Sequence, residues 1–146
     1  MFVEFMQEQL LLFVALAVIL AMLVYSYVGD RISGYKSIGS AEAIRLYNDD
    51  VFLLDVRTSG EFRDGAIGNA VNISVTELPS KIDTLNTPKD QPLLVYCQTG
   101  ARSARAAGML AKKGFTQVYN LSGGMTAWKS AGLPVGSQKS KKNRKK

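Results

Sequence analysis

The sequence contains no histidine and only one cysteine, Cys97. Without imidazole, Ser-His-Asp hydrolysis, Cys-His nucleophile pairs and His-ligated metal sites are excluded. A single thiol excludes an internal disulfide and a zinc site built from several thiolates, so we expect no metal, no cofactor and no disulfide partner. Any chemistry at Cys97 therefore has to proceed without a histidine base.

Charge is missing from a long stretch near the N-terminus, because residues 9–29 contain no Asp, Glu, Lys or Arg. Most of this stretch, residues 10–28, is apolar, and a helix of that length measures about 28 Å, close to the ~30 Å hydrocarbon core of a bilayer. A cleaved signal peptide would need basic residues before the apolar run, and residues 1–9 contain none. The sequence therefore predicts one transmembrane helix at 10–28, preceded by a short N-terminal segment at 1–9.

Basic residues flank the apolar run on one side only. Arg31 and Lys36 follow it, and no Lys or Arg precedes it. The positive-inside rule then places the N-terminus outside and the rest of the chain in the cytoplasm, a reducing compartment that suits an unpaired cysteine. We expect a single-pass protein of a bacterial-type inner membrane with its folded domain on the cytoplasmic side.

The net charge of +6 resides in residues 137–146, which carry six Lys or Arg and no acid. This segment has no apolar residue to bury, so the sequence predicts a disordered basic tail. Two interpretations stay open. The tail is either a solubilising end, or an electrostatic contact for anionic lipid, RNA or an acidic partner.

Residues 36–136 have the pattern of a folded α/β domain, joined to the apolar run by a linker at 29–35. Short apolar runs predict strands at 51–55, 70–73, 93–97 and 117–120. Helical segments alternate with these strands, at 40–47, around Ile82 and Leu85, at 103–113 and at 125–131. Continuous apolar strands that alternate with helices indicate a parallel sheet covered on both faces.

Cys97 ends the strand at 93–97, and the short loop 98–102 leads from it into a helix. Ligands of open α/β sheets bind beyond the carboxyl ends of the strands. The N–H groups of such a loop point toward one centre, the helix dipole adds positive potential, and Arg102 adds a full charge. These features favour a nucleophilic thiolate. The alternative, a small buried core cysteine, explains neither Gly100 in the loop nor Arg102 after it.

Motifs across the whole domain, in their order and spacing, resemble a single rhodanese domain. The matching segments are Leu54-Asp55-Val56-Arg57, Glu61-Phe62, residues 65–70, Ile73, residues 97–103, Gly114-Phe115, residues 121–125 and Ala127-Trp128. The resemblance implies an α/β rhodanese-like three-layer fold with a five-stranded parallel sheet, here preceded by one transmembrane helix. One departure is visible, because members commonly carry His where Ala66 stands, which bears on local packing and not on the cysteine loop.

The same resemblance implies a sulfurtransferase of the thiosulfate type. Cys97 accepts a sulfane sulfur as a persulfide and passes it to a thiophilic acceptor such as a thiol or cyanide. The implied binding residues are those of the loop: Gln98, Thr99, Gly100, Ala101 and Arg102. Their N–H groups and the Arg102 side chain hold the terminal sulfur and the small anionic donor.

Several other residues have both a functional and a structural interpretation. Arg57 is a candidate substrate contact, although a structural pair with Glu61 explains it equally well, and Asp55 is better explained as a cap of its loop. Gly123-Gly124 indicates a tight turn before the last helix, because the Lys and Ser or Thr of a phosphate-binding loop are missing. Trp128 is expected in the core.

Two alternatives to sulfur transfer belong to different classes. Cysteine-dependent phosphatases of the cell-cycle type share this fold and loop plan, but they need five residues between Cys and Arg, and only four lie between Cys97 and Arg102. A non-catalytic rhodanese-like binding module at the membrane is the other alternative. Such modules usually lack the cysteine or loop residues, and both are present here.

Overall fold

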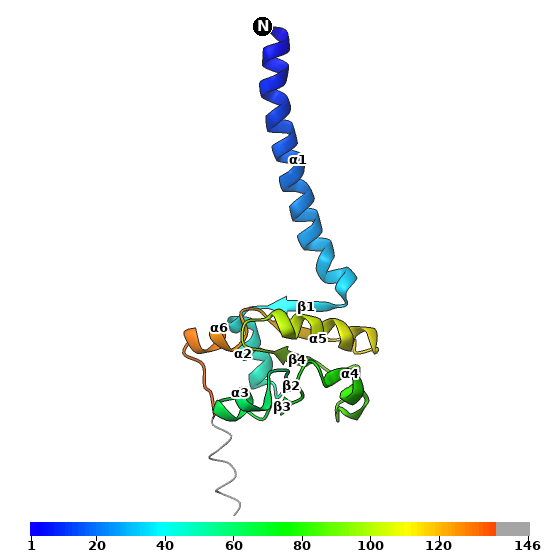
Figure 1. Cartoon of the computed structure of the whole chain (residues 1–146), viewed down its shortest axis with the longest axis vertical. Coiled ribbons are helices and arrows are strands. Elements are labelled where there is room, and N and C mark those ends of the chain that lie inside the picture. Colours follow the sequence, from blue (N-terminus) through cyan, green and yellow to red (C-terminus); the bar gives the residue numbers. More distant parts are fainter. Residues whose placement is uncertain (137–146) are drawn as a thin grey trace, which may run out of the picture. The chain divides into compact units, whose positions relative to one another are not determined.

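The computed structural model describes residues 1–136, with residue 30 described by its backbone alone, so the predicted basic tail at 137–146 lies outside the described residues. The chain divides into two units, Met1–Ser33 and Gly34–Lys146. Figure 1 shows the elements in chain order. The boundary falls at Gly34, whose positive φ of 74° ends the first helix.

The first unit is one helix, α1 (Phe2–Ser33), of 32 residues. It includes the expected span 10–28, and it is long and apolar enough to cross a membrane, a property that anchors and signal sequences share. The expected segment 1–9 is helical from Phe2, and the expected linker at 29–35 is corrected. Residues 29–33 continue the helix, because the single Gly29 costs only ~1 kcal/mol and no proline follows it. Tyr35 already begins a strand.

The second unit, as far as residue 136, is a five-stranded sheet with helices on both sides. Its strands are β1 (Tyr35–Ile38), β2 (Phe52–Asp55), β3 (Val71–Asn72), β4 (Leu93–Tyr96) and β5 (Val118–Leu121). Every pairing is parallel, in the order β1-β5-β4-β2-β3. The predicted five-stranded parallel sheet is therefore confirmed.

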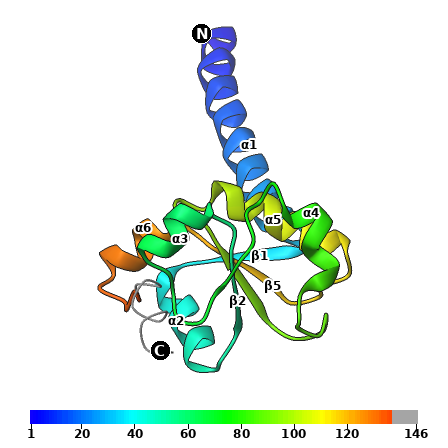
Figure 2. The ribbon, with the colours of Figure 1, turned by 60° about the horizontal axis from the view of Figure 1, so that its bottom comes forward.

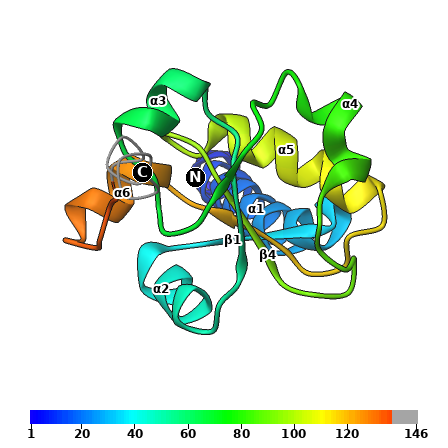
Figure 3. The same ribbon diagram turned by 90° about the horizontal axis from the view of Figure 1, so that it is seen from below.

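The helices are α2 (Ser40–Asn48), α3 (Ser59–Asp64), α4 (Leu78–Lys81) with the 3₁₀ turn Ile82–Thr84, α5 (Ala101–Lys112) and α6 (Gly124–Ser130). Figures 2 and 3 show α4 and α5 on one side of the strands and α2 and α6 on the other. Alternate residues of β4 face the two layers. Leu93 and Val95 belong to the α4–α5 core, whereas Leu94 and Tyr96 belong to the α2–α6 core.

Two elements have no counterpart among the predicted segments. The strand β1 carries the polar residues Lys36 and Ser37 on exposed positions at the sheet edge, so it lacks the apolar run that marks a buried strand. The six residues of α3 include one large apolar side chain, Phe62, which is too few for a helical period. Its capping box was a usable signal, since Thr58 accepts from the Glu61 N–H and donates to the Glu61 carboxylate.

Two turns at the carboxyl ends of β4 and β5 lie against each other. The first residues of α6 donate to the first turn: the Met125 N–H donates to the Cys97 carbonyl (2.9 Å) and the Thr126 N–H to the Gln98 carbonyl (3.1 Å). The approach is close at Gly124, because a Cβ added there would lie against the Cys97 carbonyl oxygen and 2.7 Å from the Gln98 carbonyl carbon. The predicted tight turn at Gly123-Gly124 is therefore confirmed.

This close approach predicts a large stability cost for Gly124→Ala. Gly124 has φ +53° and Gly132 has φ +71°, so alanine meets the same left-handed backbone at both sites, a cost of about 1–2 kcal/mol. Only Gly124 adds a clash, since nothing lies within 4 Å of a Cβ at Gly132. We expect Gly124→Ala to lower the free energy of unfolding by at least twice as much as Gly132→Ala.

The measurement is urea unfolding of the full chain in mild detergent, followed by tryptophan fluorescence. Trp128 is the only tryptophan and is fully buried, so the signal reports on the second unit. Equal destabilisation by the two alanines would contradict the close approach.

Candidate active site

Cys97 lies at the point where β4 ends and its loop begins. The preceding residues Leu93–Tyr96 are fully buried, and Cys97 itself has no exposed surface. Its Sγ accepts the Gly100 N–H at 3.0 Å. Gly100 has φ +105°, a left-handed backbone that turns this N–H back toward the sulfur and starts α5.

The loop presents its N–H groups to the sulfur because its first carbonyls are bound elsewhere. The carbonyls of Cys97 and Gln98 point away from the sulfur and accept from the first N–H groups of α6. The Thr126 hydroxyl donates to the Gln98 carbonyl as well, at 3.1 Å. A peptide whose carbonyl is fixed on one side directs its N–H to the other side. The arrangement is therefore suited to hold an electron-rich sulfur.

The pKa of the Cys97 thiol lies below its ordinary value, although the largest single influence opposes this shift. Burial alone would raise the pKa, because it disfavours the charged thiolate. The neighbouring Ser103 side chain and the N–H groups of Ser103, Gly100 and Thr99 outweigh it. The thiolate is thus stabilised by neutral donors, without a histidine.

Ser103 is a site residue that the sequence did not single out. It is fully buried on the first turn of α5, and its Oγ lies 2.6 Å from Asn120 Oδ1 on β5 and 3.1 Å from the Gly100 carbonyl oxygen. Asn120 is also buried. The contact between Ser103 and Asn120 could not be predicted from the sequence, because it requires knowing that β5 lies beside β4.

Arg102 forms an ion pair through two nitrogens with Glu61, which lies in the first turn of α3. Its Nη1 and Nη2 donate to the two Glu61 carboxylate oxygens at 2.9 and 3.0 Å. The hydrogen bonds from Arg102, the largest influence, lower the pKa of Glu61 to about 2. Both side chains are about one-third exposed, at 35% and 33%. The cation expected beside the cysteine is therefore present, and it is held by a carboxylate.

The expected pairing of Arg57 with Glu61 is wrong. Arg57 is buried and pairs with Asp55, through Nη2 to Oδ2 at 2.7 Å and Nε to both carboxylate oxygens at 3.1 Å. Glu61 is instead bound by Arg102, because α3 brings its carboxylate to the start of α5. Asp55 accepts the Arg57 N–H at 2.9 Å, a contact that agrees with its interpretation as a cap of this loop.

Arg57 also links the segment at Gly65 to the cysteine loop. Nη2 donates to the Gly65 carbonyl at 2.6 Å, and Nη1 donates to Gln98 Oε1 at 3.3 Å. The Gln98 amide in turn donates to the Thr126 hydroxyl at 3.3 Å. Arg57 is 3% exposed, and its Nη1 contacts the loop through Gln98.

The other predicted loop residues follow Cys97 directly and differ in exposure. Thr99 and Ala101 are exposed, and the Thr99 N–H is among the groups that lower the pKa of the Cys97 thiol. Trp128 is fully buried, as predicted, and its indole N–H donates to the Pro134 carbonyl at 2.9 Å. Ala66 is buried in a backbone bridge to Gly136, apart from the cysteine loop.

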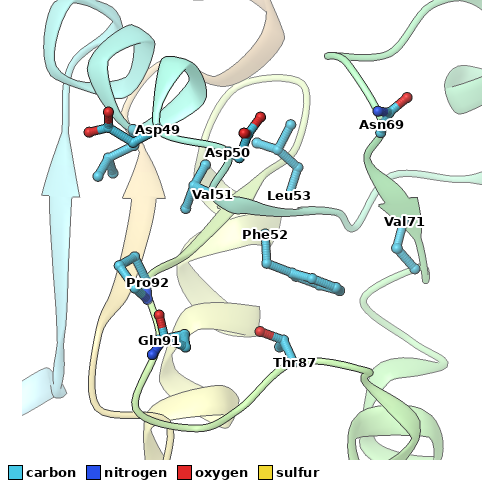
Figure 4. Close-up of a pocket in the computed structure, with 11 residues that line it drawn as sticks. Asp49, Asp50, Val51, Phe52, Leu53, Asn69, Val71, Thr87, Gln91 and Pro92 are labelled. Carbon is cyan, nitrogen blue, oxygen red and sulfur yellow. The ribbon is translucent and has the colours of Figure 1, made fainter.

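A cavity of about 470 Å³ lies at the opposite end of the sheet, where β2 and β4 begin. Figure 4 shows the Phe52 ring projecting into it between Val71 and Thr87. It contains no part of the cysteine loop. Within residues 1–136, no group of three or more His, Cys, Asp or Glu side chains is placed to hold a metal ion.

Comparisons with known proteins agree with this geometry. The sequence model of the rhodanese-like domain family matches residues 40–131. A sulfurtransferase of Allochromatium vinosum is 38% identical over 87 residues, 60% of this chain and 79% of its own. The thiosulfate sulfurtransferase GlpE of Coxiella burnetii is 35% identical over 97 residues, 66% of this chain and 89% of its own.

A solved structure is similar as well. The crystal structure of a rhodanese-related protein from Thermoplasma volcanium superposes with a TM-score of 0.63 at 35% identity, covering 71% of this chain and all of the other. The residues matched by the family model, 40–131, include the cysteine loop.

The hydrogen bonds at the sulfur predict that Ser103→Ala raises the pKa of Cys97. The Ser103 side chain is one of the groups that lower the pKa of the thiol, so its removal is expected to raise that pKa. The rate of iodoacetamide alkylation, measured against pH, reports only Cys97 because no other thiol exists. Ser130→Ala, at the end of α6, is the matched control. An unchanged profile for Ser103→Ala would show that the hydroxyl does not act on the sulfur.

Proposed function

The chain belongs to the rhodanese-like domain family, and from this premise we propose that it is a membrane-anchored sulfurtransferase that works through a Cys97 persulfide. The observation that carries the proposal is the Cys97 sulfur at the centre of a ring of neutral donors. The Gly100 N–H lies 3.0 Å away, and the pKa of the thiol is lowered. A nucleophile prepared in this way needs no base within the site.

In the first half-reaction, the Cys97 thiolate attacks the outer sulfur of a sulfane donor. With thiosulfate, the donor's S–S bond breaks, a new bond joins Cys97 Sγ to the transferred sulfur, and sulfite leaves with the electron pair. The N–H groups of Gln98 to Arg102 are proposed to hold the terminal sulfur, and the Arg102 guanidinium the anionic end of the donor. Arg57, which donates to Gln98 Oε1 at 3.3 Å, is proposed to position Gln98.

In the second half-reaction, a thiophilic acceptor attacks the outer sulfur of the persulfide. The acceptor is a thiolate or cyanide, and it forms a bond to the outer sulfur while the Sγ–S bond breaks. The Cys97 thiolate returns to the donors that stabilised it at the start. A loop that favours the thiolate therefore favours both the first attack and the final departure.

The loop length separates sulfur transfer from phosphate chemistry. Only four residues lie between Cys97 and Arg102, and the Gly100 N–H of this loop donates to the Cys97 sulfur at 3.0 Å. A tetrahedral phosphate needs a wider ring of N–H groups. The phosphatase alternative is tested by hydrolysis of a phenyl phosphate, and the binding-module alternative by the absence of any persulfide.

For the first unit, the proposal is a single-pass anchor in a bacterial-type inner membrane, with the N-terminus outside and the second unit in the cytoplasm. Its support is the apolar length of α1 and the basic residues Arg31 and Lys36 on one side only. The basic residues 137–146 are proposed to contact anionic lipid on the same face, at ~1 kcal/mol for each charge near the surface.

The persulfide predicts a single sulfur adduct on the protein. Treatment of the full chain with excess thiosulfate is expected to add about 32 Da, one sulfur, which a reducing thiol removes. Cys97→Ser is expected to lose both the adduct and the transfer of sulfur to cyanide, while its tryptophan fluorescence stays that of the folded chain. Intact mass and thiocyanate formation are the two measurements. Full turnover by Cys97→Ser would end the proposal.

The proposed topology predicts one-sided access to protease. Residues 34–146 are expected to be protected in intact cells and cut after the inner membrane is opened, whereas a tag on Met1 is reached from outside that membrane. Immunoblotting of both ends checks this, with a known cytoplasmic protein as the control. The reverse pattern would contradict the orientation drawn from the flanking charges, and release of a shortened chain would identify a cleaved signal.

A further inference from the structure

The charged side chains at the cysteine loop form pairs that sum to zero. Two arginines belong to the loop or contact it, and each is held by its own carboxylate. Arg57 pairs with Asp55 at 2.7 Å, and Arg102 pairs with Glu61 through both terminal nitrogens, at 2.9 and 3.0 Å. Neither guanidinium therefore offers the loop an uncompensated positive charge.

The thiolate adds a negative charge to this neutral set. The groups that lower the pKa of the thiol most are the Ser103 side chain and the N–H groups of Ser103, Gly100 and Thr99, which are neutral. Arg102 also interacts with Cys97 through its charge, but Glu61 already compensates that charge. The neutral groups stabilise one charge on a small atom through short contacts, such as the 3.0 Å contact between the Gly100 nitrogen and Sγ. Such contacts stabilise one negative charge on a sulfur atom, but they do not compensate the two further charges that a dianionic donor brings.

Sulfane donors differ in the charge that they bring. Thiosulfate is a dianion, so its encounter with the thiolate places three negative charges within one small site. A persulfide of a thiol, R–S–SH, carries at most one negative charge on its two sulfurs and meets the thiolate in its neutral form. Like charges in a partly desolvated site repel one another several-fold more strongly than in water.

Resting on the proposed sulfur transfer, we propose that the preferred donor of this site is the persulfide of a thiol, and that Glu61 sets this preference by neutralising Arg102. The Cys97 thiolate attacks the outer sulfur of R–S–SH. The donor S–S bond breaks, the Sγ–S bond forms, and the thiolate R–S⁻ leaves with the electron pair. The proton stays on the transferred sulfur, so Cys97–S⁻ and R–S–SH give Cys97–S–SH and R–S⁻, with no external oxidant.

Glu61 is placed to act on the donor through charge and not through contact with the sulfur. Its partners are Arg102 on one side and Thr58 on the other, where the Thr58 hydroxyl donates to Oε1 at 3.1 Å. Arg102, the member of the pair on α5, directly follows the exposed Ala101, the first residue of that helix. Partial exposure screens the pair and weakens its effect, so a graded preference is expected and not an absolute one.

The test compares two donors on the full chain in detergent. One is thiosulfate, and the other is the persulfide of N-acetylcysteine methyl ester, which carries no further charged group. The rate of sulfur addition to Cys97, read by intact mass, is measured for wild type and for Glu61→Gln. Glutamine keeps the capping box of α3. The persulfide-to-thiosulfate rate ratio of the variant is compared with that of wild type, so the intrinsic reactivities of the donors cancel.

Two further variants separate charge from structure. Glu61→Asp keeps the negative charge on a shorter side chain. Glu42→Gln removes an exposed carboxylate of α2 that pairs with Lys36 at 3.4 Å, and it serves as the matched control. We expect Glu61→Gln to lower the ratio at least tenfold, mainly through faster reaction with thiosulfate. Glu61→Asp and Glu42→Gln are expected to stay within about twofold of wild type, as for surface charges outside the site.

The outcomes distinguish failure of the donor preference from failure of sulfur transfer. An unchanged ratio in Glu61→Gln, or an equal loss of both rates, would overturn the role of Glu61 in donor choice. A ratio that falls equally in Glu61→Asp would show that geometry and not charge is responsible, and it would overturn the proposal too. If neither donor adds sulfur to Cys97 in wild type, sulfur transfer itself fails, and the donor preference fails with it.

Discussion

The cysteine loop depends on the hydrogen bonds that fix its carbonyl groups to the start of α6. The N–H groups of Met125 and Thr126 bind the carbonyls of Cys97 and Gln98, and this fixes the peptide planes of the loop. The contact requires glycine at position 124, because a side chain there would clash with the Cys97 carbonyl oxygen. Two neighbouring strands, β4 and β5, have to end at the same height for the turns to meet. The site is therefore a property of the sheet order as much as of the loop sequence.

The two ion pairs near the loop contribute differently to stability because one is buried and the other is partly exposed. Asp55 and Arg57 are 0% and 3% exposed, and removal of one partner of such a pair would leave an uncompensated buried charge, which costs about 3–5 kcal/mol. Asp55 and Arg57 therefore hold the frame on which Gln98 rests. Glu61 and Arg102 lie at the surface, where a pair contributes little stability. Their importance lies in the electric potential at the mouth of the site.

Much of the fold was predictable because its central strands are apolar runs. The buried strands β2 and β4 match the predicted runs within one residue at each end, and the cysteine loop follows directly from the end of β4. The edge strand β1 and the short α3 were not predictable from hydrophobic period, because neither buries a continuous face. The pairing of Arg102 with Glu61 was missed for the same reason. Glu61 lies on α3, and without this helix the sequence does not show that its carboxylate lies beside the loop. Ser103 and Asn120 meet across an interval of 17 residues, a pairing that sequence spacing alone does not give.

The strand order also has a consequence for how the chain is made. β1 follows α1 directly in the sequence, but its only neighbour in the sheet is β5. Ile38 therefore cannot pair until Leu121 has been synthesised. At a synthesis rate of about 5–20 residues per second, roughly 80 intervening residues take on the order of 4–16 s. During this interval β1 has no strand to pair with, because β5 is still untranslated. Its shortness and its exposed Lys36 and Ser37 suit that wait, since a short polar edge is a poor template for aggregation with other nascent chains.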